Sequence, residues 1–189
     1  MIRSIVATWV LAHRGPEALA GATLATLLIA AIGWQPLDLL RDAQPPPLWA
    51  VYPGMIALIA TTVGRNRLAA LTAATPRGLV APRAAWLLAA TLGAGLLALV
   101  VQSALGQRGI WVFCTGLTAI TLGLGAVWRP LGLIVAAGVE LWAVTSAARA
   151  AFISADPPAQ LFARLGAEGV TFWWVAVALC AAVYVWRGE

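Results

Sequence analysis

Long apolar stretches separated by short polar or proline-containing segments make up most of this chain. A transmembrane helix needs about 20 predominantly apolar residues to cross the hydrocarbon core of a bilayer. The pattern predicts an all-α integral membrane protein with about six transmembrane helices, and no length remains for a second domain. The predicted spans cover about 18–34, 48–63, 84–102, 110–127, 131–148 and 170–186.

Prolines and short polar segments mark the connections between the predicted spans. Asp38, Asp42 and the prolines at 45–47 follow the first span. Consecutive prolines cannot continue a helix, so this stretch predicts a loop outside the membrane. Only residues 128–130 separate the fourth and fifth apolar runs, which together are too long for one crossing. We therefore expect a tight helical hairpin there.

The N-terminal residues 1–14 have a different pattern, with apolar residues on one face of a helix. Arg3, Ser4 and Arg14 fall mainly outside that face. This arrangement is typical of an amphipathic helix that lies in the membrane interface. Residues 1–189 then form one transmembrane domain. The apolar positions are Ile2, Ile5, Val6, Trp9 and Val10.

The composition agrees with a chain that is surrounded mostly by lipid. Apolar residues account for 62% of the sequence, charged residues for 10%, and the mean hydropathy is +0.89. Soluble domains have about 25% charged residues. The net charge of +5 comes from arginines scattered between the apolar runs, since there is no lysine. These arginines predict topology and contact with the bilayer, and we expect no nucleic-acid partner.

The distribution of arginines between alternate connections predicts the orientation of the chain. Eight arginines would lie on one side of the membrane and four on the other, and the arginine-rich side is normally cytoplasmic. We therefore expect a multi-pass protein of the cytoplasmic membrane with both termini in the cytoplasm. The larger set is Arg3, Arg14, Arg65, Arg67, Arg77, Arg83, Arg129 and Arg187, and the smaller set is Arg41, Arg108, Arg149 and Arg164.

Residues needed for common catalytic sites are scarce in this sequence. A phosphate-binding loop of the Walker A type requires a lysine, which the chain lacks. His13 is the single histidine, and Cys114 and Cys180 lie in apolar runs without metal-ligand spacing. We therefore expect no catalytic residues, no metal site, no cofactor and no enzymatic activity on this chain itself.

Glu140 is the one acidic residue that we expect deep in the membrane. It lies about ten residues into the fifth span, which corresponds to a depth of about 15 Å. An ionisable residue at this depth can bind a cation or proton, or contact a polar group of a substrate. Alternatively, a protonated or hydrogen-bonded carboxyl can simply pack helices together. The sequence leaves both interpretations open.

Pairs of small residues spaced four apart occur in several spans. Such pairs let helix backbones approach closely, and ordinary helix packing is their more frequent role. A groove facing a substrate is the alternative. The pairs are Ala89/Gly93, Thr91/Gly95, Ala119/Gly123, Thr121/Gly125 and Gly132/Ala136.

The segment 64–83 between the second and third spans carries the main functional signal. It is the longest and most basic connection on the predicted cytoplasmic side, and its first half has the pattern of a short helix that Thr75 and Pro76 would end. With its Leu71 to Pro76 stretch, the chain resembles the membrane subunits of ABC transporters of the ABC-2 type, whose coupling helix ends in a similar Leu-x-x-Thr-Pro sequence. Arg65 and Arg67 stand where that family usually has acidic residues.

The resemblance implies a permease without its own ATP-hydrolysing site, which exports a hydrophobic or amphipathic substrate. Its partners would be a separate ABC ATPase subunit and a second permease half, either identical or different. The resemblance assigns the contact with the ATPase to one set of residues. They are Arg65, Arg67, Leu68, Leu71, Thr75, Pro76 and Arg77.

Two other functions fit the same pattern of spans. One is the substrate-binding S-component of an energy-coupling-factor vitamin importer, which uses small residues on its first helix, and the pairs Ala18/Ala22 and Gly21/Ala25 would fit that pattern. The other is a structural or assembly subunit of a larger membrane complex. The external loops offer few polar groups for a vitamin beyond Asp38, Asp42 and Asp156. The extracytoplasmic segment 149–169 is short for a member of the ABC-2 type.

Overall fold

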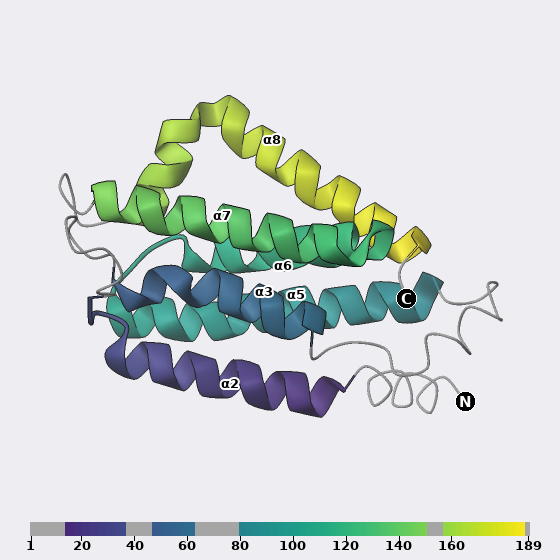
Figure 1. The fold of residues 1–189 in the computed structure, drawn as a ribbon, viewed down its shortest axis with the longest axis horizontal. Helices are drawn as coiled ribbons and strands as arrows, with labels where there is room; N and C mark the ends of the chain where they lie inside the picture. The colour runs from purple at the N-terminus through teal and green to yellow at the C-terminus, as the bar shows by residue number, and fades with distance from the viewer. Residues whose placement is uncertain (1–13, 37–46, 63–79, 151–156, 188–189) are drawn as a thin grey trace.

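The computed structural model describes residues 14–36, 47–62, 80–150 and 157–187. In these ranges the chain is all-helical, with six α-helices, one short 3-10 helix and no strand. Figure 1 shows the helices running back and forth along the long axis of the molecule. In chain order, the elements are α2 (Gly15–Ile32), η1 (Leu48–Val51), α3 (Tyr52–Thr62), α5 (Val80–Leu105), α6 (Ile110–Val127), α7 (Arg129–Ala150) and α8 (Pro157–Arg187).

The observed helices coincide with the predicted apolar spans. α6 has the predicted limits, while α5 and α7 extend a few residues beyond theirs. α8 begins at Pro157, well before the span predicted from residue 170, so part of the segment predicted to lie outside the membrane is helical. The predicted interfacial helix over 1–14 lies outside the described residues except for Arg14.

Four of the described helices contain segments that are long and apolar enough to cross a bilayer: Gly15–Ile32, Val80–Leu105, Ile110–Val127 and Val170–Arg187. Two further apolar helical stretches, Leu48–Thr62 and Pro130–Leu141, are shorter. A multi-pass membrane protein follows from these helices, while the count of six crossings stays a prediction. Large apolar side chains cover the outside of the bundle, including Leu24, Leu96 and Leu179, each more than 60% exposed.

α6 lies at the centre of the bundle and packs against α3, α5, α7 and α8. α2 packs on the other side, against α3 and α5 (Figure 1). Glycines on α6 and α7 allow α6 to lie close to α8 and to α7. A Cβ atom on Gly116 would lie 2.5 Å from the indole ring of Trp173 in α8, and one on Gly132 would lie 2.5 Å from the carbonyl oxygen of Thr121. Both positions require glycine because any side chain would push the helices apart.

Short turns connect the central helices. Trp128 is the single residue between α6 and α7, and its extended backbone reverses the chain. The predicted tight hairpin is therefore confirmed. Between α5 and α6, Gly106 and Gly109 have φ angles of +66° and +84°, which glycine adopts without strain. Between α2 and η1, the amides of Leu48 and Trp49 donate to the carbonyls of Gln35 and Gly33, which brings the two described ends of that loop together.

Candidate functional site

An apolar groove lies between α2, α3 and α5. Its volume is about 380 Å³. Its mouth opens to the outside of the bundle beside Leu19, which is 60% exposed. We call this hollow the α2–α5 groove. It is lined by Gly15, Pro16, Ala18, Leu19, Ala22, Ile56, Ile59, Ala60, Trp86, Ala89, Ala90, Gly93, Ala94 and Leu97.

The α2–α5 groove exists because small residues face one another across it. A Cβ atom on Gly93 would have no heavy atom within 4 Å, so no neighbouring helix fills the space above this position. Ala89, one turn earlier, also lines the groove. Apart from the indole N–H of Trp86, the lining side chains are entirely apolar. The groove is therefore suited to an apolar molecule or an alkyl chain.

Three other glycines from the predicted small-residue pairs lie in close contact with neighbouring helices. Gly95 lies against Thr115 of α6, and Gly123 lies against the backbone of Cys180 in α8. Gly132 of α7 lies against the backbone of Thr121 and Gly125 in α6. These three glycines serve helix packing, whereas Gly93 lines the groove.

Glu140 lies inside the bundle, where its carboxyl group packs directly against the backbone of Gly54 in α3. A Cβ atom on Gly54 would lie 2.6 Å from Cδ and 2.8 Å from Oε2 of Glu140. Both carboxyl oxygens are buried. The Gly54 backbone interacts with the carboxyl, but neither oxygen has a hydrogen bond of acceptable geometry.

The interior also contains other polar groups, whose contacts the sequence did not predict. Cys114 of α6 and Tyr52 of α3 are both completely buried. The Tyr52 hydroxyl lies 2.8 Å from Oγ1 of Thr26, which also donates to the carbonyl of Ala22. Each residue sits in an apolar run without a charged neighbour, so the sequence offers no signal that they meet.

The residues predicted to contact an ATPase lie outside the described part of the chain. They are Arg65, Arg67, Leu68, Leu71, Thr75, Pro76 and Arg77. The structure does describe the helices on either side of them. α3 ends at Thr62 and α5 begins at Val80, so the last four residues of the predicted segment 64–83 belong to α5.

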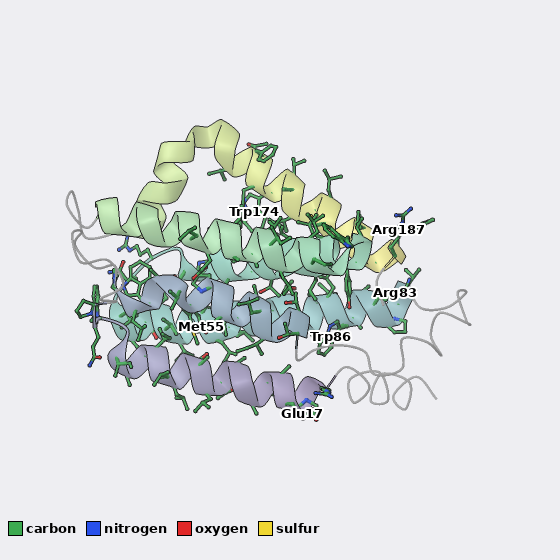
Figure 2. The ribbon with its side chains drawn as sticks, viewed as in Figure 1. Glu17, Met55, Arg83, Trp86, Trp174 and Arg187 are labelled. Carbon is green, nitrogen blue, oxygen red and sulfur yellow. The ribbon has the colours of Figure 1, made fainter. Side chains whose placement is uncertain are left out.

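Charged residues gather at the end of the bundle where α3 ends and α5 begins. Glu17, Arg83 and Arg187 all lie toward this end (Figure 2). Nη1 of Arg83 donates to the backbone carbonyl of Trp186, 3.1 Å away, and so connects α5 with the end of α8. The described residues contain no group of three or more His, Cys, Asp or Glu side chains that could hold a metal ion.

Comparison with known proteins yields no relative for this chain, because no family model, curated protein or solved structure matches it.

Proposed function

We propose that this chain is the membrane permease subunit of an ATP-driven ABC transporter, which exports a hydrophobic or amphipathic substrate. A separate ATPase subunit would supply the energy, and a second permease half would complete the transport pathway. The coupling segment resembles that of the ABC-2 type through Leu71 to Pro76.

The observation that carries this proposal is the position of the α2–α5 groove relative to that segment. α3 contributes Ile56, Ile59 and Ala60 to one wall, and α5 contributes the stretch from Trp86 to Leu97 to another. These are the two helices that enter and leave the proposed coupling segment. A movement of that segment would therefore act on both walls at once.

Transport by this chain would depend on two arrangements of its helices rather than on chemistry at its side chains. ATP-driven closure of the partner would push on residues 64–83 and change the separation of α3 and α5. A substrate in the groove would then have different contacts in the two states, and this difference in affinity drives its release.

The apolar lining favours this function over a vitamin-capturing S-component. A polar vitamin requires several convergent hydrogen-bonding groups, whereas the lining side chains are apolar except for Trp86, whose indole nitrogen is buried. An alkyl chain needs none.

The test is association with an ATPase encoded in a neighbouring reading frame. The two chains are co-expressed, and the tagged membrane subunit is purified in mild detergent. We expect the ATPase to co-purify, and we expect the double variant Leu68→Asp, Leu71→Asp to lose it while inserting normally. A segment that only contacts anionic lipid would respond to arginine removal instead.

The companion variant is the triple change Arg65→Gln, Arg67→Gln, Arg77→Gln, which removes charge and leaves both leucines in place. Loss of the ATPase from the leucine variant supports docking through an apolar groove of the partner, and any loss from the arginine variant measures how much these three residues add to the same contact. Absence of any co-purifying nucleotide-binding subunit from the unaltered chain would overturn the proposal.

A further inference from the structure

We propose that Glu140 is a proton-binding site, and that its neutral carboxyl group holds α7 against α3. The site comprises the carboxyl of Glu140 and the backbone of Gly54, against which it packs. This role is independent of any ATPase, because it follows from the contact between two helices of this chain.

The packing at Gly54 fixes where the carboxyl group lies. Because Cγ, Cδ and Oε2 of Glu140 would all stand within 2.8 Å of a Cβ atom on residue 54, only glycine permits the contact. Gly54 is itself buried, as are its neighbours Tyr52 and Pro53. Water is therefore excluded from the α3 side of the carboxyl.

No side chain that the structure describes donates a hydrogen bond to the carboxyl of Glu140. From α3 the carboxyl meets the Gly54 backbone, and the titratable side chains on α3 and α6, both of which pack against α7, are Tyr52 and Cys114. From η1, which also packs against α7, the buried residues are Trp49 and Ala50, and neither titrates.

On α8 the side chains are described from Val170 onward, and the titratable ones among them lie farther along the bundle. Cys180 packs at the level of Gly123 in α6, and α6 in turn meets α7 at Gly132. Gly132 is eight residues before Glu140, which corresponds to about 12 Å along the helix. Tyr184 and Arg187 follow Cys180, farther toward the end of α8. Neither supplies a positive charge to the carboxyl.

An isolated carboxylate is far more costly to bury than a neutral carboxyl, because it loses its hydration without gaining a cation or hydrogen-bond donors. The carboxyl in the closed contact is therefore protonated. Ionisation transfers the proton to water, while the carboxylate keeps the bonding electron pair. Since water must first reach Oε1 or Oε2, ionisation requires α3 and α7 to separate.

Proton release and helix separation are thus linked equilibria. Raising the pH favours the separated state, and lowering it favours the closed one. α3 also forms a wall of the α2–α5 groove through Ile56 and Ile59. A proton on Glu140 would therefore influence the shape of that groove from the opposite side of α3.

The first experiment is infrared difference spectroscopy of the full chain in detergent at neutral pH. We compare the unaltered protein with Glu140→Gln, and use Glu17→Gln as the matched control because Glu17 is exposed on α2. We expect Glu140→Gln to remove a band of a protonated carboxylic acid, and Glu17→Gln to remove only carboxylate bands. Loss of a carboxylate band from the Glu140→Gln variant would overturn the proposal.

The second experiment needs no variant and so remains decisive if Glu140→Gln does not fold. Dicyclohexylcarbodiimide is a hydrophobic reagent whose nitrogen takes the carboxyl proton while its central carbon bonds to the oxygen, and the adduct rearranges to a stable acylurea. We expect mass spectrometry to find this adduct on Glu140, with a labelling rate that falls about tenfold per pH unit once the carboxyl ionises. Absence of an adduct on Glu140, or labelling that does not change with pH, would overturn the proposal.

Discussion

The hydroxyl groups of Thr26 in α2 and Tyr52 in α3 lie 2.8 Å apart in the interior of the bundle, where both side chains are at most 2% exposed. This hydrogen bond joins α2 to the helix that carries Gly54. Because Thr26 also donates to the carbonyl of Ala22, the Tyr52 hydroxyl donates to Thr26 and the two bonds form a chain.

Tyr52→Phe removes the hydrogen bond from Tyr52 to Thr26 and leaves the aromatic ring in place. We expect the free energy of unfolding to fall by about 0.6–1.5 kcal/mol, the range measured for hydrogen bonds between membrane helices. Thr26→Val and the double variant complete a cycle, measured by unfolding in mixed detergent micelles. Additive losses in the double variant would show that the two hydroxyl groups do not interact.

Gly123→Ala is expected to destabilise the contact between α6 and α8. Its methyl group would collide with the backbone of Cys180, which cannot move aside as a flexible side chain can. We expect a loss of about 1–3 kcal/mol, typical of an overpacked interior. The control is Gly93→Ala, which meets no atom within 4 Å and should leave the stability unchanged or slightly higher. Equal losses in both variants would contradict the assigned packing.

Gly93→Phe should fill the α2–α5 groove without disturbing the rest of the bundle. We expect binding of a dansylated fatty acid to weaken by about tenfold or more, equivalent to ~1.4 kcal/mol. Leu92→Phe adds a similar ring at a position that is 61% exposed on the outside of the same helix, and it should bind the probe normally. Unchanged fluorescence titrations for Gly93→Phe would show that the groove does not hold the alkyl chain.

Both termini are predicted to be cytoplasmic from the excess of arginines on their side. Single cysteines at residues 2 and 188, in a background without Cys114 and Cys180, should resist an impermeant thiol reagent in intact cells. Arg108→Cys, in the turn between α5 and α6 at the opposite end of the bundle, should react. Labelling of either terminus from outside would contradict the predicted orientation.

The helix limits followed closely from the sequence, because prolines and glycines act locally. The Trp128 to Pro130 stretch marks the end of α6 and the start of α7 whatever surrounds it. The start of α8 was harder to predict, since the residues from Pro157 onward are less apolar than those after Val170 and yet continue as one helix. Hydropathy marks the segment that can enter a membrane, not the full length of the helix that contains it.

The interior sites could be predicted only in part. The sequence identified Glu140 as unusual, but its contact with Gly54 joins residues 86 positions apart, and the register of packed helices decides that pairing. The same limitation applies to Gly93 and Gly123, which have the same local pattern. One lines the α2–α5 groove and the other packs against α8, and their difference depends entirely on neighbouring helices.

The central position of α6 has a consequence for how the protein is synthesised. α6 is the most enclosed of the four helices that could span a membrane, and the atoms nearest to Gly116 and Gly123 on its surface belong to α8, the last helix of the described chain to leave the ribosome. Until Trp173 and Cys180 have been translated and inserted, the backbone of α6 at Gly116 and Gly123 is exposed to lipid. A chain truncated before residue 170 would keep that face uncovered, which a membrane quality-control protease could recognise as an unfinished bundle.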